Sequence, residues 1–453
     1  MILVANENGH VFPRDFTQDL PMAVKASGIY IYDDQGKEYI DGCSGALISN
    51  VGHCVPEVVE AICEQLRRLE FAHTSRWRNE AIERAAAQVA SLAPVGMSHV
   101  WFVSGGSEAV ESAVRLARSF YLERDGGRSQ KHLIIGRWNS YHGSTMGAVA
   151  VGGNIPRRRA FVPMFMEHPK IETHYCYRCP FSLAYPSCGC LCARKLEEAI
   201  KRIGPQYVAA FLAEPIVGST VGALPPPDEY WPMVREICDR YDVLLIADEV
   251  MTGFGRTGEN FAVDHWGAIP DVIACAKGMA AGYVPTGGVI VKDAVVEVIK
   301  KGSGAFPMAH TYCGNPVSGV AVEAVIKYIK AHNLVENARL QGELLGSLLK
   351  ELEEIPIVGE VRGKGLMWGV ELVADKATKR PFPRKLKASG VVTRECMRRG
   401  FVVYRGGGMA DGVDGDNFMV APPLIVEEDE VREITSRLKG ALEAASEALR
   451  VGV

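Results

Sequence analysis

The sequence predicts an α/β protein with a mostly parallel sheet, because short apolar runs alternate with helical patterns between residues 99 and 300. The run 243–247 is wholly aliphatic, as in a strand that is buried on both faces of a parallel sheet. Amphipathic helical periodicity, as in 230–240, lies between most of these runs. The runs predicted to be strands are 99–103, 133–135, 208–213, 243–247, 272–275 and 288–291.

A second, α+β domain is expected after Pro316, where the pattern changes. A chain of 453 residues is too long for one compact core, so two domains are expected. We predict an N-terminal segment, 1–60, that joins the small domain, a large domain at 61–315 and a small domain at 316–453. Small-domain elements are expected at 318–352 (helical), 357–361, 366–372, 391–399 (helical), 401–404 and 427–449 (helical).

Composition and charge exclude several classes of partner. The net charge of −4 argues against a nucleic-acid partner or an anionic membrane surface. No apolar run is long enough to span a bilayer, and the first ten residues lack the pattern of a signal peptide. Twelve scattered cysteines favour reduced thiols over a disulfide framework. We therefore expect a cytoplasmic protein.

Charged residues follow two of the buried runs directly. The run 243–247 ends in Asp248-Glu249, and the run 272–275 is followed by Lys277. Parallel strands present their carboxyl ends at one edge of the sheet, where ligands of such folds collect. A desolvated lysine beside a carboxylate suggests a covalent cofactor site, with Lys277 forming a Schiff base.

A glycine pair precedes the helix that follows strand 99–103. In Ser104-Gly-Gly-Ser-Glu108 the free backbone N–H groups of the helix start would favour a phosphate. An ordinary serine-capped helix is the alternative. A planar aldehyde cofactor with a phosphate would satisfy this site and Lys277 together, with Asp248 keeping its ring nitrogen protonated.

Two further residues follow strands that lead to the same edge. Tyr141 comes soon after strand 133–135 and could cover the face of a flat ligand, although a half-buried loop tyrosine is the alternative. Glu214 ends strand 208–213 with another carboxylate. These residues, Asp248 and Lys277 are expected in one crevice.

The motifs taken together resemble the class III pyridoxal-phosphate aminotransferases, which have fold type I. The resemblance runs from Gly28 to Leu424, nearly the whole chain, and its motifs occur in the family order. They are Ser104-Gly-Gly-Ser-Glu-Ala109, Tyr141-His-Gly143, Asp248-Glu-Val-Met-Thr-Gly-Phe-Gly-Arg-Thr-Gly258, Ala276-Lys-Gly278 and His310-Thr-Tyr-Cys-Gly-Asn-Pro316.

The resemblance implies a large domain with a mostly parallel seven-stranded sheet, an α+β small domain and pyridoxal 5′-phosphate as cofactor. It implies that Lys277 forms the internal aldimine and that Asp248 pairs with the pyridinium nitrogen. Thr311 would reach the phosphate of the neighbouring subunit, so that the active unit is a homodimer, with a tetramer left open. The remaining implied contacts with the cofactor site are Gly106 and Ser107 to the phosphate, Val250 and Tyr141 to the ring faces, and His142 and Glu214.

The implied reaction is ping-pong transamination from an ω-amino acid or small amine to a 2-oxo acid, pyruvate or 2-oxoglutarate. A lyase or racemase that uses the same cofactor is the alternative, and a non-catalytic protein on the same fold is a third. Leu47 stands where many amine-accepting relatives have Trp, and Met251 stands where many have Gln. Arg405 is the candidate for binding a substrate carboxylate, against a solvated surface arginine.

Five cysteines cluster in a Pro- and Tyr-rich insertion, with the spacing Cys176-x2-Cys179-x8-Cys188-x3-Cys192 and Cys190 as an extra thiol. This spacing permits a structural zinc site with four thiolates. Reduced thiols or a redox-labile pair are the alternatives. The aminotransferase chemistry needs no metal, so we expect none in the active site.

Overall fold

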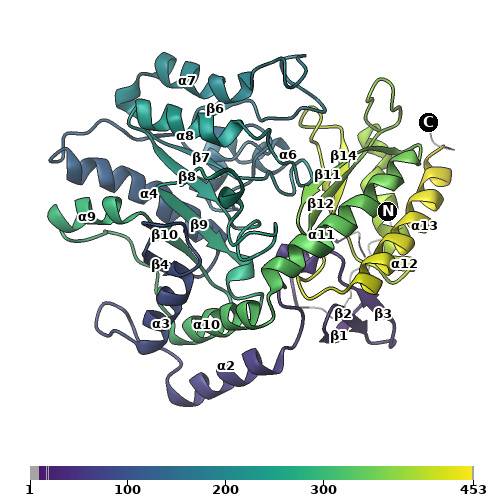
Figure 1. The fold of residues 1–453 in the computed structure, drawn as a ribbon, viewed down its shortest axis with the longest axis horizontal. Coiled ribbons are helices and arrows are strands. Elements are labelled where there is room, and N and C mark those ends of the chain that lie inside the picture. Colours follow the sequence, from purple (N-terminus) through teal and green to yellow (C-terminus); the bar gives the residue numbers. More distant parts are fainter. Residues whose placement is uncertain (1–9, 17, 19, 451–453) are drawn as a thin grey trace.

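A seven-stranded sheet forms the centre of the larger of two lobes in the computed structural model, which describes residues 10–16, 18 and 20–450 (Figure 1). The five strands from β9 to β6 pair in parallel, and β10 runs antiparallel between β4 and β9. The predicted mostly parallel sheet is confirmed. In spatial order its strands are β4 (His99–Val103), β10 (Gly287–Val291), β9 (Val272–Ala276), β8 (Leu244–Asp248), β7 (Val208–Ala213), β5 (Leu133–Arg137) and β6 (Lys170–Ile171).

Helices cover both faces of this sheet, which explains why its central strands are mostly apolar. In β8, Leu244 and Ile246 pack towards one set of helices, and Leu245 and Ala247 pack towards the other. The first set is α4 (Gly106–Arg124), α5 (Met146–Val151) and α9 (Asp293–Lys301). The second set is α7 (Leu191–Ile203), α8 (Tyr230–Arg240), α3 (Glu80–Ala90) and α10 (Pro316–Ala331), with α2 (Pro56–Arg68) packed on α10.

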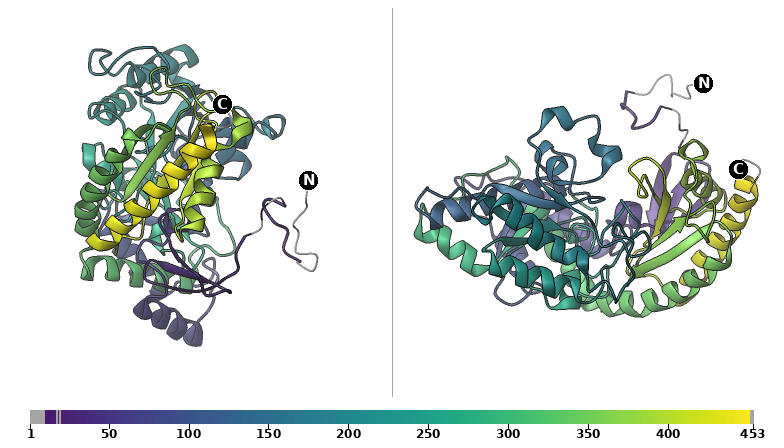
Figure 2. Two further views of the ribbon diagram at one scale, coloured as in Figure 1. Left: turned by 90° about the vertical axis from the view of Figure 1, so that its right-hand side faces the viewer. Right: turned by 90° about the horizontal axis from the view of Figure 1, so that it is seen from above.

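The smaller lobe is built on a four-stranded antiparallel sheet, in the order β11 (Val358–Lys364), β12 (Met367–Leu372), β14 (Asp416–Val420) and β13 (Tyr404–Gly407). Its helices are α11 (Leu334–Glu351), α12 (Ala388–Arg398) and α13 (Glu428–Arg450). Figure 2 shows α13 on the outer side of this lobe, away from the large sheet. The two short helices α1 (Ser44–Leu47) and α6 (Ile155–Arg158) lie in connections.

The N-terminal strands form a small antiparallel sheet that is attached to the smaller lobe. The strands are β1 (Ala23–Ser27), β2 (Tyr30–Asp33) and β3 (Glu38–Ile40). The Ile40 N–H donates to the Gly400 carbonyl at 2.9 Å, and the Val402 N–H donates to the Ile40 carbonyl at 3.0 Å. These bonds fasten the N-terminal segment beside β13.

Two sequence expectations for the smaller lobe are wrong in detail. The helical stretch expected at 318–352 is two helices, because Asn333 takes a left-handed φ of 51° and ends the periodic backbone. The strand expected at 401–404 instead begins at Tyr404 and continues to Gly407, while Phe401 forms only an isolated bridge with Ile40. An apolar run that is followed by glycines therefore does not determine where a strand begins or ends.

The packing of α10 bears on the division into domains. This helix lies against α2 and α3, whereas α11 packs on β11 and α13. We propose that 1–60 joins the small domain, that 61–315 forms the large domain, and that 316–453 contains both the connection through α10 and the small domain itself.

Arg256 lies at the junction of the two lobes, fully buried. Its guanidinium donates to the carbonyls of Leu366 (3.0 Å) and Pro422 (2.6 Å) and to the side-chain oxygens of Ser44 (3.1 Å) and Asn50 (2.8 Å). Burial lowers the pKa of Arg256 to about 9, a cost that these hydrogen bonds offset in part. One side chain thus joins the large lobe, the small lobe and the N-terminal segment.

None of the helices in the described residues is long and apolar enough to cross a membrane. The expectation about the first ten residues concerns positions that, apart from His10, lie outside the described ones.

Candidate active site

Asp248 and Lys277 meet because β8 and β9 are parallel neighbours. Asp248 is the last residue of β8 and lies in register with Ala274, and Lys277 directly follows the last residue of β9. Lys277 starts a short 3₁₀ helix (Lys277–Met279) with a left-handed φ of 45°, a strained conformation for a side chain-bearing residue. The parallel pairing of β8 and β9 brings the two residues together at one edge of the sheet, as predicted.

The amine of Lys277 is prepared for reaction by its surroundings. Burial lowers the pKa of Lys277 to about 8, and the nearby charge of Asp248 opposes this shift only in part. Its Nζ forms no hydrogen bond with any described residue. A substantial neutral fraction near physiological pH makes it a usable nucleophile.

The carboxylate of Asp248 is buried, and hydrogen bonds fix its orientation. Its Oδ2 accepts from His142 Nδ1 at 2.7 Å, and its Oδ1 accepts the Val250 N–H at 3.1 Å. His142 is also buried, and its Nε2 has no partner among the described residues. His142 therefore orients the Asp248 carboxylate.

The start of α4 forms a cradle beside Asp248 and Val250. No described side chain caps this helix start, so its first backbone N–H groups are free for an anion. Gly106 is required there, because a Cβ at this position would lie 2.9 Å from Val250 Cγ1. Ser107 Oγ accepts the Ser144 N–H at 3.0 Å, which brings the 141–144 loop to the cradle.

Tyr141 and Glu214 lie on the far side of the crevice. The Tyr141 hydroxyl is 2.9 Å from Ser144 Oγ, and the guanidinium carbon of Arg157 lies 4.1 Å from its ring centre. Glu214 accepts the N–H groups of Tyr141 (3.4 Å) and Gly218 (3.1 Å). Burial raises the pKa of the Glu214 carboxyl, and within the described chain this carboxyl forms no ion pair with an arginine.

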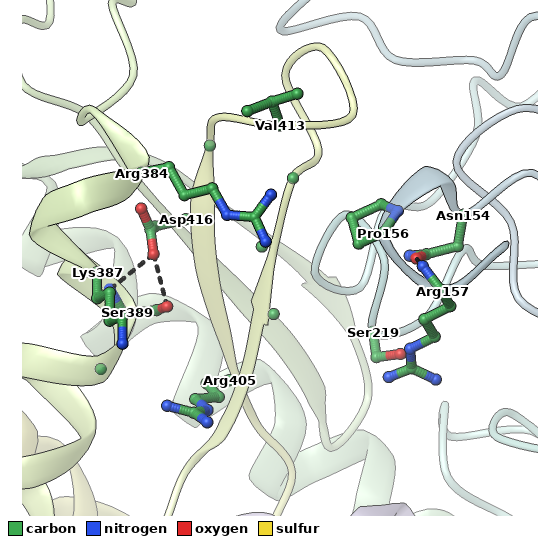
Figure 3. Close-up of a pocket in the computed structure, with 15 residues that line it drawn as sticks. Asn154, Pro156, Arg157, Ser219, Arg384, Lys387, Ser389, Arg405, Val413 and Asp416 are labelled. Atoms are coloured by element: carbon green, nitrogen blue, oxygen red, sulfur yellow. Dashed lines mark hydrogen bonds between the residues drawn. The ribbon is translucent and has the colours of Figure 1, made fainter. Parts of the chain in front are cut away.

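Leu47, Arg405 and Thr311 lie in three different surroundings. Leu47 is 1% exposed and packs in an apolar cluster with Ile216 and Met251. Arg405 is exposed on β13 and lines a separate cavity of about 420 Å³ (Figure 3). Thr311 is exposed, in a loop that lies beside the first turn of α4, since His310 Nδ1 is 3.9 Å from Glu108 Oε1.

A model of the aminotransferase class-III family matches residues 12–442. The chain is a class III aminotransferase.

Similar proteins agree with this assignment. The aminotransferase is 37% identical to the uncharacterised aminotransferase YodT of Bacillus subtilis, over 98% of this chain and 99% of that protein. It is 36% identical to putrescine–pyruvate aminotransferase of Pseudomonas aeruginosa, over 94% of this chain and 91% of that protein. A transaminase from the marine bacterium Virgibacillus has the same fold, with a TM-score of 0.89 and 33% identity over 97% of this chain and 98% of its own. The fold expected from the resemblance is thereby confirmed.

Class III aminotransferases depend on pyridoxal 5′-phosphate, and a solved amine transaminase at a TM-score of 0.89 is described as PLP-bound, with 33% identity over 97% of this chain and 98% of its own. The residues of this aminotransferase fit that cofactor. The uncapped helix start at Gly106 suits a phosphate, the amine of Lys277 is unpartnered, and the buried carboxylate of Asp248 suits a ring cation.

Two residues of the aminotransferase site escaped the sequence prediction. Glu249 is fully buried and accepts the N–H groups of Ala262 (3.0 Å) and Val263 (2.9 Å) and the Thr252 hydroxyl. It therefore holds the loop after β8. Arg157 belongs to a run of three arginines, and that run was the available signal for a cationic site.

The five clustered cysteines of the aminotransferase line one small cavity, and Cys190 Sγ lies 3.8 Å from Cys192 Sγ. Among the residues that the structure describes, no group of three or more metal-ligating side chains could hold a metal ion, so the zinc interpretation gains no support. The insertion contacts the small sheet, where Arg178 Nε donates to the buried Glu371 at 2.5 Å. This contact links the insertion, which belongs to the larger lobe, to the sheet of the smaller lobe.

Proposed function

We propose that this class III aminotransferase moves an amino group from an ω-amino acid or small amine to a 2-oxo acid, pyruvate or 2-oxoglutarate, by a ping-pong mechanism. The observation that carries the proposal is the pair formed by Lys277 and Asp248 at adjacent strand ends, with the Lys277 pKa lowered to about 8. Relatives named putrescine–pyruvate aminotransferase and γ-aminobutyrate transaminase support donors of this kind.

Bound pyridoxal phosphate supplies an electrophilic aldehyde carbon and a ring that accepts the electron pair left when the substrate's α carbon loses a proton. Lys277 Nζ would bind that carbon and, once displaced by the amino donor, move the proton as base and then acid. Asp248 would keep the ring nitrogen protonated, and His142 would hold the Asp248 carboxylate through the 2.7 Å contact.

The residues around Lys277 and Asp248 would position the cofactor. The N–H groups of Gly106 and Ser107 would bind the phosphate at the helix start. Val250, which packs against Gly106, would support one ring face, and Tyr141 would cover the other. Glu214, near Tyr141, would close the substrate side of the crevice.

Substrate recognition would involve Arg405 and Leu47. Arg405 is exposed and without an ion pair among the described residues, so it is free to bind a substrate carboxylate. Leu47 would shape the donor pocket through its apolar cluster with Met251, and its size does not favour bulky aromatic amines.

A homodimer is proposed as the active unit, in which Thr311 of one subunit reaches the phosphate site of the other. Thr311 is exposed beside Tyr312, whose side chain is 64% exposed, and Trp77 is 68% exposed. Two hydrogen bonds join the segments that carry Trp77 and Tyr312: Asn79 Nδ2 donates to the Gly314 carbonyl at 3.0 Å, and Asn315 Nδ2 donates to the Glu70 carbonyl at 3.2 Å. Exposed aromatic side chains next to a cofactor cradle fit contact with a second copy. We also propose a cytoplasmic location, on the twelve scattered cysteines.

Chemical trapping tests the role of Lys277. Borohydride reduction of the purified holoenzyme should attach the cofactor irreversibly to the peptide that contains Lys277, as located by mass spectrometry. Lys277→Ala should show no label and no turnover. A label on another lysine, or turnover by Lys277→Ala, would refute the assignment.

Acceptor dependence separates transamination from the lyase and racemase alternatives. Amine loss from the donor should require a 2-oxo acid and yield the matching amino acid in equal amount. Ammonia release or inversion of the donor without any acceptor would reject the proposed reaction.

A further inference from the structure

A cavity of about 420 Å³ between the lobes is lined by four cationic side chains on two opposite sides (Figure 3). Arg157 of α6 lies on one side, near Ser219. Arg384, Lys387 and Arg405 lie on the other, around the edge of the small sheet. A cavity of this size holds a small organic molecule.

The protein offsets the positive charge in this cavity only in part. Within the described part of the chain, none of the four cations forms an ion pair. One carboxylate, that of Asp416, faces these four cations; its Oδ1 accepts from the Ser389 N–H at 2.9 Å and from the Ser389 hydroxyl at 2.6 Å, and the cations outnumber it. Four cations around a concave surface attract anions strongly.

The cavity adjoins the cofactor crevice through Arg157. Arg157 stacks on Tyr141, with its guanidinium carbon 4.1 Å from the ring centre, and Tyr141 lies in the cofactor crevice. The charge of Arg157 also contributes to lowering the pKa of Lys277, so this side of the cavity is electrostatically close to Lys277.

We infer that the cavity binds a dianionic substrate, namely a 2-oxo dicarboxylic acid and the amino dicarboxylic acid formed from it. The inference rests on the proposed transamination and chooses between its two acceptors. Arg157 holds one carboxylate, and the cations on the opposite side hold the other. A single carboxylate, as in pyruvate, cannot engage both sides at once, whereas a five-carbon diacid offers one carboxylate to each. Guanidinium groups suit this task because they bind carboxylates through two parallel hydrogen bonds.

Binding of non-reacting acids to the holoenzyme tests the inference without turnover. Calorimetric titration should show glutarate binding at least about tenfold more tightly than valerate, the monoacid of equal length. Arg157→Gln and Arg384→Gln should each remove most of that preference. Arg159→Gln and Lys385→Gln are the matched controls, because both residues are exposed and neither lines the cavity; they should keep the preference.

Steady-state kinetics give the second readout. The ratio of kcat/KM for 2-oxoglutarate to kcat/KM for pyruvate should fall about tenfold or more in Arg157→Gln, through KM rather than kcat. Equal binding of glutarate and valerate, or an unchanged ratio in Arg157→Gln, would overturn the inference. Turnover with pyruvate alone would then leave the proposed function standing. Failure of every acceptor would instead reject that function, while the glutarate titration still decides the charge of the ligand.

Discussion

Gly106→Ala should weaken cofactor binding through steric overlap alone. The new Cβ would lie 2.9 Å from Val250 Cγ1 and 3.2 Å from Cγ2, well inside the 3.5 to 4.0 Å at which carbon atoms normally touch. Gly106 is not in the left-handed region, so alanine meets no backbone strain there. Val250 is β-branched and moves little. Overpacking of this kind costs about 1–3 kcal/mol, roughly a 5- to 150-fold rise in Kd if the whole cost falls on the holo state.

The assay is titration of pyridoxal phosphate back into the resolved enzyme, followed by its absorbance. Gly105→Ala is the control, because its backbone is extended (φ 174°) and a Cβ there would meet nothing within 4 Å; its Kd should stay within about twofold. The Gly106→Ala/Val250→Ala double variant should recover part of the loss, with a coupling of about 1 kcal/mol or more. Additive effects, or a normal Kd in Gly106→Ala, would refute the proposed contact.

Three further outcomes are expected. Asp248→Asn should retain cofactor but lose at least about 90% of kcat, since the ring nitrogen loses its counter-charge; a near-normal rate in single-turnover measurements would contradict this. Burial raises the pKa of Glu249 to about 7, so its contribution to stability declines as the pH rises from about 4.5 to 7. The stability advantage of the wild type over Glu249→Gln in urea unfolding should therefore shrink by up to about 3 kcal/mol between pH 4.5 and 8, and a constant difference would count against it. Tyr312→Lys should give monomers with weakened cofactor binding by light scattering and titration, whereas Val95→Lys, at a 91% exposed position, should not; a dimeric, active Tyr312→Lys would oppose the proposed interface.

The sequence predicted those features that depend on local pattern and sheet geometry. Asp248 and Lys277 can be paired from the sequence alone, because buried runs that end in charged residues must deliver them to one edge of a parallel sheet. The free helix start at Gly106 follows from a glycine pair between a strand and a helix. Both inferences require only the chain direction and its periodicity.

The rest depended on contacts between distant segments. The break at Asn333 was missed because apolar periodicity continues across it, and only a left-handed φ interrupts the helix. Arg157 lies 120 residues from Lys277 in the chain, and although its run of three arginines signals a cationic site, that run does not show that the site adjoins Lys277. The cluster that Leu47 forms with Ile216 and Met251 likewise brings together distant segments of the chain. Packing of this kind is decided by the tertiary fold rather than by local propensity.

Arg256 has a consequence for how the enzyme unfolds. Separation of the lobes would strip this guanidinium of its partners at Leu366, Pro422, Ser44 and Asn50 while it remained attached to the loop that follows Asp248. Loss of the small lobe or of the N-terminal segment removes part of this hydrogen-bond set, so we expect the loop, and the cofactor site with it, to be destabilised as well. We therefore expect the two lobes to unfold together in a single transition, despite their two separate sheets.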